Sequence, residues 1–308
     1  MAAPTKMENS VSELNMLKDQ EDDAARKISS RWIGEVSGLV SPPDVYVKVF
    51  DLMESPTATA DEMGMIISQD PSLTARLLKI VNSPFYNFSS RIDTVSRAVA
   101  VVGLRELYSL VVAVSAVKSF SAIPNDVVNM DTFWRHSIYC GIISRLLARR
   151  CNVLHTERLF IAGLLHDIGS LVIYNRVPDI AKKILTTAEG DEERLYTVEL
   201  DELGFTHADL GGELLKQWTL PEALQEAVAC HHEPKRASSA RMEAAIVHIA
   251  NILANRSELG AFCEVKVPPT EIDESVWSAT GLSKENFDGE EVIGEAGIQF
   301  VETASLFW

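Results

Sequence analysis

The spacing of apolar residues is the feature that most constrains the fold of this chain. From residue 131 onward, apolar side chains recur every three or four residues, which is the period of an amphipathic helix. Alternating runs of Val, Ile and Thr, which would indicate strands, are scarce, and 264–267 is too short to change the class. The sequence therefore predicts an all-α fold. The clearest helical segments are 131–150, 156–177, 206–217, 220–232 and 241–255.

Capping and breaking residues divide this pattern into separate helices. Asp70-Pro71 starts a helix, a long apolar helix begins near Thr94 and is interrupted near Gly103, and Pro178 and Pro234 mark helix ends. The tail after Pro268 is expected to form two short helices. Three predicted helix starts have the three-residue spacing of a capping box: Thr59 with Glu62, Thr206 with Asp209, and Thr219 with Glu222.

Charge and hydropathy narrow the partners and the compartment. The net charge of −16 gives the chain no general attraction to nucleic acid or to anionic membranes, so both are unlikely partners. The first 20 residues lack the apolar stretch of a signal peptide, and no run reaches the roughly 18 apolar residues of a spanning helix. The four cysteines form no CxxC pair and are expected to be free thiols. We therefore expect a cytoplasmic protein.

All seven histidines lie between residues 136 and 248, so both ends of the chain lack them. The sharpest signal is His166-Asp167, which lies within an apolar helical pattern. A buried His-Asp pair needs a partner for its carboxylate, and a divalent cation is one, because imidazole nitrogen and carboxylate oxygen both ligate first-row metals. A hydrogen-bonded core pair is the alternative. Gly169, which has no side chain, would let another helix approach closely.

The other candidates are individually weak. His136 lies on an apolar stripe, where a core histidine is the alternative to a ligand. His207 follows the predicted cap Thr206 and looks exposed at a helix start. His231-His232 ends a helix, where the helix dipole alone would favour such a pair. The Asn251 carboxamide could also ligate a metal but would bring no charge.

Together these residues resemble a known superfamily. Their order along the chain is similar to that of the HD metal-dependent phosphohydrolases, and the remaining motifs resemble the HDOD domain over about residues 35–255. The motifs similar to its N-terminal half are Pro42-Pro43, Asp70-Pro71-Ser72-Leu73-Thr74, Asn82-Ser83-Pro84, and Ala98 through Gly103-Leu104. Those similar to its second half are His231-His232-Glu233-Pro234 and Val247-His248-Ile249-Ala250.

This resemblance implies a division of the chain and a bacterial signalling context. The HDOD domain is a regulatory output module with a fold similar to that of HD-GYP proteins. The expected parts are an N-terminal tail or helix (1–30), an HDOD N-terminal helical subdomain (31–130), an HD-like helical subdomain with the candidate site (131–258) and a C-terminal helical extension (259–308).

The resemblance also implies a metal-ligand set, with Fe, Mn or Zn as one or two divalent ions. Asp167 would bridge the two ions and would be the catalytic residue if the protein were active. One ion would be held by His136, His166, Asp167 and Asn251, and a second by Asp167, His207, His231 and His232.

Four departures from the active HD pattern argue against hydrolysis of cyclic dinucleotides. Asn251 replaces the last Asp, Ser170 replaces a Lys, and Thr132 replaces a carboxylate of three-metal relatives. The residues 234–237 replace a Gly-Tyr-Pro motif. Three hypotheses remain: a signalling module that keeps a metal site, a metal-dependent phosphohydrolase with a degenerate catalytic set, and a metal-free helical scaffold. The signalling module would act on a protein partner in trans or on a nucleotide ligand.

Overall fold

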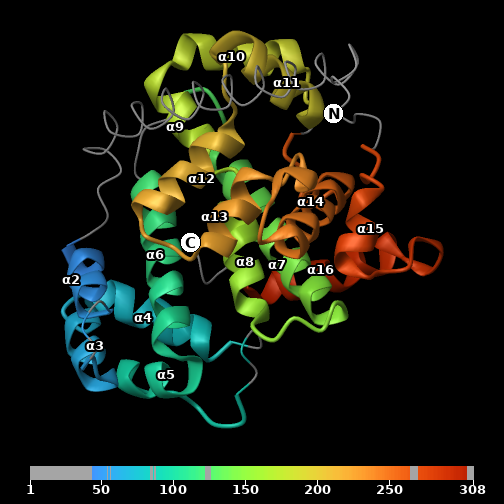
Figure 1. Ribbon diagram of the computed structural model, residues 1–308. Coiled ribbons are helices and arrows are strands. Elements are labelled where there is room, and N and C mark those ends of the chain that lie inside the picture. The colour runs from blue at the N-terminus through green and yellow to red at the C-terminus, as the bar shows by residue number, and fades with distance from the viewer. Residues whose placement is uncertain are drawn as a thin grey trace, which may run out of the picture.

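A computed structural model describes residues 44–53, 55, 57–83, 86, 88–121, 126–263 and 270–303 of the chain. Within these ranges the regular structure is entirely helical, and the prediction of an all-α fold is confirmed (Figure 1). The predicted tail 1–30, the Pro42-Pro43 motif and the extended piece 264–267 lie outside the described residues.

The N-terminal half folds as a group of helices beside one long helix, α6 (Figure 1). Gly103 has a φ of 97° and separates α5 from α6, which meet at a bend of 119°. The predicted interruption is therefore a sharp corner that a residue with a side chain would adopt only under strain. The elements are α2 (Asp44–Met53), α3 (Ala60–Ile67), α4 (Pro71–Val81), α5 (Val95–Val102) and α6 (Leu104–Ser121).

The helices that carry the candidate residues pack around α7. Helix α7 lies against α8, α14 and α16, and α12 lies against α9 and α13. The segment 156–177, expected to be one helix, is two, because the chain breaks at His166-Asp167. The elements are α7 (Met130–Arg150), α8 (Thr156–Leu165), α9 (Ile168–Arg176), α12 (His207–Gln217), α13 (Glu222–Ala229), η1 (Pro234–Arg236) and α14 (Arg241–Arg256).

The predicted caps are mostly confirmed. Thr59 and Thr206 form capping boxes with Glu62 and Asp209. The third predicted capping box, Thr219 with Glu222, was wrong. Thr219 has a φ of 51°, and α13 begins after Pro221 without a side-chain cap. The tail contains α15 (Ser275–Thr280), η2 (Lys284–Asn286) and a longer α16 (Gly289–Thr303).

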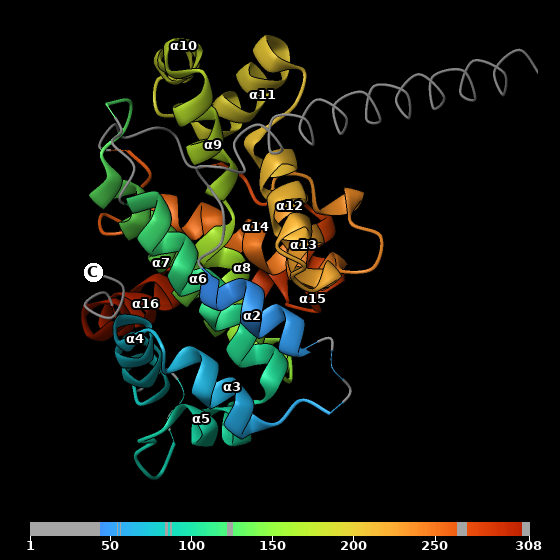
Figure 2. The same ribbon diagram turned by 90° about the vertical axis from the view of Figure 1, so that its left-hand side faces the viewer.

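Two helices between His166-Asp167 and His207 were not among the predicted segments. Helices α10 (Pro178–Ala188) and α11 (Glu192–Leu203) form a hairpin that stands above the other helices (Figures 1 and 2). Pro178 follows the end of α9, as predicted, and also occupies the first position of α10, where its missing N–H costs nothing.

One continuous core joins both halves of the described chain. It extends from Val49 in α2 to Phe300 in α16 and includes buried residues of α6, α7, α8 and α14. Among the described residues, no single helix is long and apolar enough to cross a membrane, although the bent pair α5–α6 passes that test by length and composition.

Gly169 is a point of close approach between α9 and α12. A β-carbon at this position would lie 2.0 Å from the His207 carbonyl oxygen and 2.7 Å from the Gly211 nitrogen. We expect Gly169→Ala to lower the free energy of unfolding by at least about 2 kcal/mol, because two backbones must separate to admit the methyl group. Denaturant unfolding would measure this.

Gly294→Ala is the matched control for this substitution. Gly294 is exposed within α16, with nothing within 4 Å of its would-be β-carbon. Alanine there should raise stability by up to about 1 kcal/mol through helix propensity. Equal stabilities of the two variants would contradict the proposed clash at Gly169.

Candidate metal centre

Five histidines and one aspartate from four parts of the chain meet in the interior. His136 lies on α7, His166 and Asp167 form the break between α8 and α9, and His207 is the first residue of α12. His231 and His232 follow α13. The side chains of His136, His166, Asp167, His207 and His231 are almost completely buried, and His232 is partly buried. The structure therefore brings together the five histidines and the aspartate that the sequence analysis singled out.

Backbone carbonyls fix the orientation of three of the imidazoles. The Nδ1 atom of His136 lies 2.6 Å from the Gly260 oxygen, that of His166 lies 2.7 Å from the Gly163 oxygen, and that of His231 lies 2.7 Å from the Val228 oxygen. Because a carbonyl only accepts, each Nδ1 carries the proton and donates it. The Nε2 atom of each ring is then directed inward, as in metal-binding histidines.

Asp167 lies between two groups of these Nε2 atoms. Its Oδ2 is 3.2 Å from His166 Nε2 and 3.6 Å from His136 Nε2. Its Oδ1 is 3.4 Å from His207 Nε2 and 3.8 Å from His231 Nε2. Each carboxylate oxygen thus faces its own pair of nitrogens, which is the arrangement that a bridging carboxylate would need.

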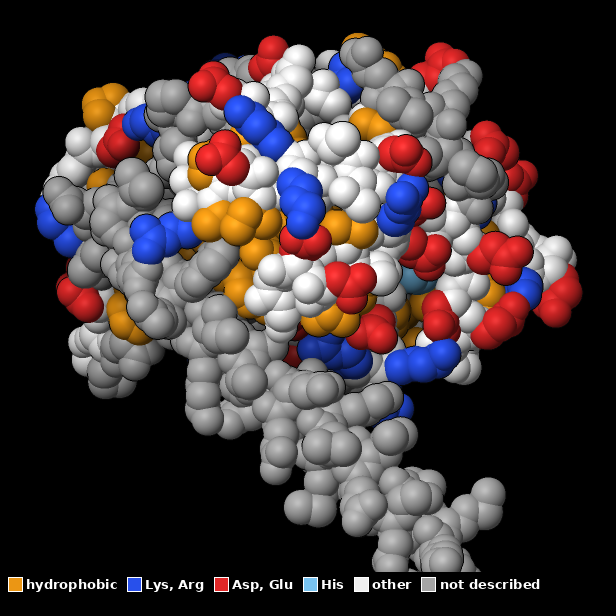
Figure 3. Space-filling view, turned by 90° about the horizontal axis from the view of Figure 1, so that it is seen from above, with side chains coloured by type: hydrophobic (Ala, Val, Ile, Leu, Met, Phe, Trp, Pro, Cys, Tyr) orange, Lys and Arg blue, Asp and Glu red, His pale blue; other side chains and the backbone are white. Residues whose placement is uncertain are grey.

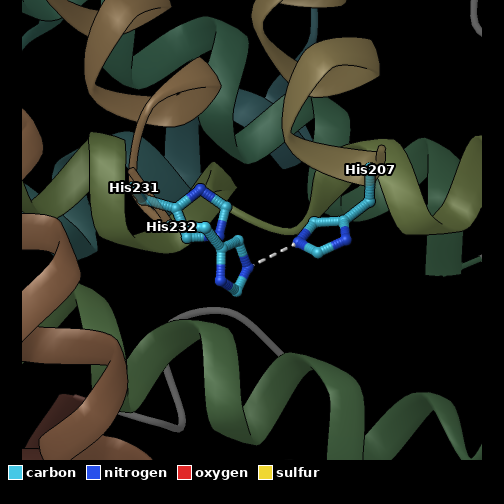
Figure 4. Close-up of side chains that lie close together, drawn as sticks. All are labelled: His207, His231 and His232. Carbon is cyan, nitrogen blue, oxygen red and sulfur yellow. Dashed lines mark hydrogen bonds between the residues drawn. The ribbon is translucent and has the colours of Figure 1, made fainter. Parts of the chain in front are cut away.

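His207 differs from the other four rings because a carboxylate, Glu199, fixes its orientation. Its Nδ1 and its backbone N–H both donate to Glu199 Oε2, each over 2.7 Å. Its Nε2 lies 3.1 Å from the Nε2 of His232, as Figure 4 shows. The expectation that His207 is exposed was wrong, because the α10–α11 hairpin covers the start of α12 and supplies Glu199.

The donor set fits a divalent cation. His136 Nε2 and His166 Nε2 lie 3.3 Å apart and both are directed inward, so either a second proton on one ring or a shared cation must lie between them. Among the described residues, Asp167 Oδ1 and His231 Nε2 are buried without a hydrogen-bond partner, a costly state for polar atoms. Nitrogen and oxygen donors without thiolate suit Fe, Mn or Zn.

Asn251 reaches the site but contacts a second carboxylate there. Its Nδ2 donates to Glu192 Oε1 over 2.7 Å, and Asn255 also donates to Glu192. Glu192, at the start of α11, was missed from the sequence. Its only sequence signal is an acidic residue in a helix first turn, which is common without any ligand. The candidate donors fall into two groups, each with its atoms within 4.8 Å of one another: His136, His166, Asp167 and Glu192, and His207, His231 and His232.

The two remaining histidines do not face this cluster. His248 Nδ1 donates to the His231 carbonyl over 2.7 Å, and its Nε2 accepts the Asp273 N–H over 3.3 Å. His248 therefore supports the turn that carries His231. His155 is exposed and directly precedes α8.

The protonation of the rings is uneven. Burial, together with neighbouring His166, lowers the pKa of His136 to about 4. Burial and adjacent histidines also lower the pKa values of His231 and His232. Burial opposes protonation of His166 and His207 as well, but Asp167 raises the pKa of His166 and Glu199 raises that of His207 to about 9.

A polar cavity of about 400 Å³ lies over His232. Of its charged lining groups, Asp191, Glu193 and Glu233 are acidic, and Arg194 is paired with Glu189 at 2.7 Å. Figure 3 views the molecule from this end, and a His side chain is visible there between Asp and Glu side chains. The lining residues are Asp191, Glu193, Arg194, Tyr196, Thr197, His232 and Glu233.

Comparison with known structures finds the same fold. An HDOD domain protein from Geobacter sulfurreducens superposes with a TM-score of 0.68 at 25% identity, covering 92% of this chain and 97% of that one. A Shewanella amazonensis SB2B protein with a provisional phosphohydrolase name superposes with a TM-score of 0.65 at 22% identity, covering 90% of this chain and 96% of that one.

Comparison of sequences identifies the family. An uncharacterized protein of Treponema pallidum is 26% identical over 211 residues, which are 67% of this chain, and the chain spans 40% of that protein's length. The sequence profile described as the HDOD domain matches residues 39–234, more than half of the chain. The chain belongs to the HDOD family.

Proposed function

We propose that this chain is a signal-transduction module of the HDOD type that retains a metal site and acts on a partner in trans. The observation that carries the proposal is the convergence of the histidine Nε2 atoms on both oxygens of Asp167, within 3.2 to 3.8 Å. Two buried atoms of this set, Asp167 Oδ1 and His231 Nε2, have no hydrogen-bond partner, and a bound cation would satisfy both.

The two groups of donors would hold one or two cations. His136, His166, Asp167 and Glu192 offer one set, and His207, His231 and His232 offer another that Asp167 Oδ1 faces. A bound cation would supply Lewis acidity and a fixed positive charge. The chain itself would contribute the fixed ring orientations, through Gly260, Gly163, Val228 and Glu199.

The negative charge around the cavity favours a role in cation binding over the hydrolysis of anionic phosphoesters. Three carboxylates and one paired guanidinium line it, so an anionic phosphate would be repelled and a cation attracted. Ser170, where active relatives carry Lys, is buried and adds no positive charge. The runner-up function is a metal-dependent phosphohydrolase, which is favoured by the opening of a polar cavity directly over His232.

Elemental analysis of the purified protein tests this proposal. We expect one to two equivalents of Fe, Mn or Zn per chain, a lower melting temperature after chelation, and recovery when the cation returns. A metal-free preparation whose melting temperature ignores all three ions would overturn the proposal. Metal-dependent turnover of bis(p-nitrophenyl) phosphate that is lost in Asp167→Ala would favour the phosphohydrolase instead.

We also predict that the metal-loaded protein does not hydrolyse cyclic di-GMP. This dinucleotide carries two negative charges, and neither Ser170 nor the residues 234–237 supply the groups that active relatives use on it. Incubation with Mn²⁺ or Fe²⁺ and chromatography of the products would measure this. Turnover that disappears in Asp167→Ala would contradict the prediction.

A further inference from the structure

The α10–α11 hairpin has a small apolar cluster of its own, separate from the main core. Ala181, near the start of α10, belongs to the main core. Farther along, Ile184, Ala188 and Leu195 form a separate small cluster. The partly buried Leu185 and Leu203 contact both clusters, and Phe262, after α14, also packs against the small one. Figures 1 and 2 show the hairpin standing away from the other helices. Apolar packing therefore holds α11 to α10 and, through the small cluster, to Phe262.

Several polar contacts attach α11 to the body, and those of Glu199, Glu192 and Tyr196 lie at or beside the histidine cluster. Glu199 accepts from His207, and the Tyr196 hydroxyl donates to Glu233 over 2.8 Å. The Tyr196 ring lies 4.7 Å from the His232 ring, between centroids. These contacts lie along one face of α11, because residues 192, 196 and 199 are four and three positions apart.

Glu192 is the member of this face that most lacks a countercharge. Its hydrogen-bond partners, Asn251 and Asn255, are neutral amides, and its carboxylate lies in one group with the Asp167 carboxylate and the nitrogens of His136 and His166. Two carboxylates so close together repel each other unless a proton or a cation is shared between them, and a cation would also satisfy the neighbouring imidazole nitrogens. Glu192 also contacts Asn251, the expected metal ligand that carries no charge, so the negative charge on this side of the site comes from Glu192.

We propose that α11 is a metal-dependent clasp, in which Glu192 binds the same cation as His136, His166 and Asp167 and thereby ties the hairpin to the body. This inference rests on the proposed metal site. The cation would join a residue of α11 to residues of α7 and of the α8–α9 break, which the described hydrogen bonds do not link directly. Without it, the described contacts of α11 with the body would be those of Glu199 and Tyr196, the amide contacts of Glu192 and the packing of its apolar cluster on Phe262.

Through the clasp, binding or loss of the cation would change the surface of the protein. Asp191, Glu193, Arg194, Tyr196 and Thr197 of the α11 region form most of the wall of the cavity over His232. Release of α11 would open this wall and expose the apolar cluster around Leu195. A partner that recognises the closed face would therefore bind only the metal-loaded protein.

Hydrogen–deuterium exchange of the full chain, with and without saturating Mn²⁺, tests the clasp. An isolated helix as short as α11 is marginal in water, so its amides exchange quickly once the helix leaves the body. We expect Mn²⁺ to slow exchange in residues 192–203 of the wild type by at least about tenfold, since a ligand at 100 times its Kd can suppress opening about 100-fold. Exchange in α4 should not change.

Glu192→Gln separates the clasp from the metal site itself. Glutamine keeps the shape and can still accept from Asn251, but it is a poor ligand. We expect this variant to retain Mn²⁺, measured by elemental analysis, while the metal no longer slows exchange in α11. Glu193→Gln, an exposed change in the same turn, is the matched control and should behave as the wild type does.

Two results would overturn the clasp and leave the proposed function intact. One is wild-type protein that binds Mn²⁺ without slower exchange in α11, and the other is a Glu192→Gln variant in which Mn²⁺ slows it as in the wild type. Protein that binds no cation would overturn both proposals. The comparison of wild-type protein with and without Mn²⁺ decides the first result even if a variant fails to fold.

Discussion

Asp167→Ala abolishes stoichiometric binding of divalent cations: this is the largest effect that we expect from a single substitution. Asp167 is the one group that faces both sets of donors, with Oδ2 toward His136 and His166 and Oδ1 toward His207 and His231. Its loss removes the shared anion, which leaves His207, His231 and His232 without an anionic donor and the other set with Glu192 alone. Elemental analysis after gel filtration would measure the loss.

The same substitution should also destabilise the metal-free protein. Burial raises the pKa of Asp167, but the attraction of His166 outweighs it and holds the pKa well below its usual range. Removing one partner of a buried charge pair leaves the other uncompensated, which costs about 3–5 kcal/mol. Denaturant unfolding in the presence of chelator would show the change, with Asp201→Ala, an exposed substitution on α11, as the control.

His207→Ala distinguishes the two parts of the site. From the sequence, loss of His207 should cost less stability than loss of Asp167, since His207 looks exposed. In the structure His207 is 1% exposed and pairs with buried Glu199, so its removal should cost a similar amount of about 3–5 kcal/mol. Metal content should distinguish His207→Ala from Asp167→Ala. The first keeps the complete donor set of His136, His166, Asp167 and Glu192, whereas the second loses the shared carboxylate. An Asp167→Ala protein with full metal content would refute a bridging role.

The predictable part of the site is the part that local sequence encodes. His136 lies on a helical apolar stripe of α7, and Thr206 starts α12 through its own capping box, so both elements could be placed from residues a few positions apart. The inward direction of the rings depends instead on carbonyls such as Gly260, which is 124 positions from His136. A contact across that separation leaves no local pattern.

The α10–α11 hairpin shows what local patterns miss. Its apolar face is short, because it packs against a small cluster of its own rather than the main core. Glu192 and Glu199 then resemble ordinary surface acids of a charged helix, and only the folded hairpin brings them to Asn251 and His207. The Thr219 error has a related cause: Thr219 takes a positive φ in a turn, so it cannot cap the helix that follows.

Cation binding should release protons, and its affinity should fall with pH. At pH 7 the lowered pKa values of His136, His231 and His232 leave these rings neutral and ready to ligate. His166 and His207, with raised pKa values, carry protons in the metal-free protein. A ligating nitrogen must be deprotonated, so binding displaces these protons.

The expected pH dependence of the affinity for the cation follows from the number of protons displaced. We expect between one and two protons released per chain at pH 7, and each released proton weakens the apparent affinity by about tenfold for every unit that the pH falls. The contribution of His207 should end only above its pKa of about 9, where the ring is already neutral. Titration calorimetry in two buffers with different protonation enthalpies would count the protons.

Glu199→Gln supplies the control for this count. Glu199 is the charge that raises the pKa of His207, so its neutral replacement should let that pKa fall toward the value that burial favours. The variant should release about one proton fewer at pH 7, because His207 would already be neutral before the cation arrives. Affinity that is constant between pH 6 and 9, or a proton count that Glu199→Gln leaves unchanged, would show that His207 does not ligate.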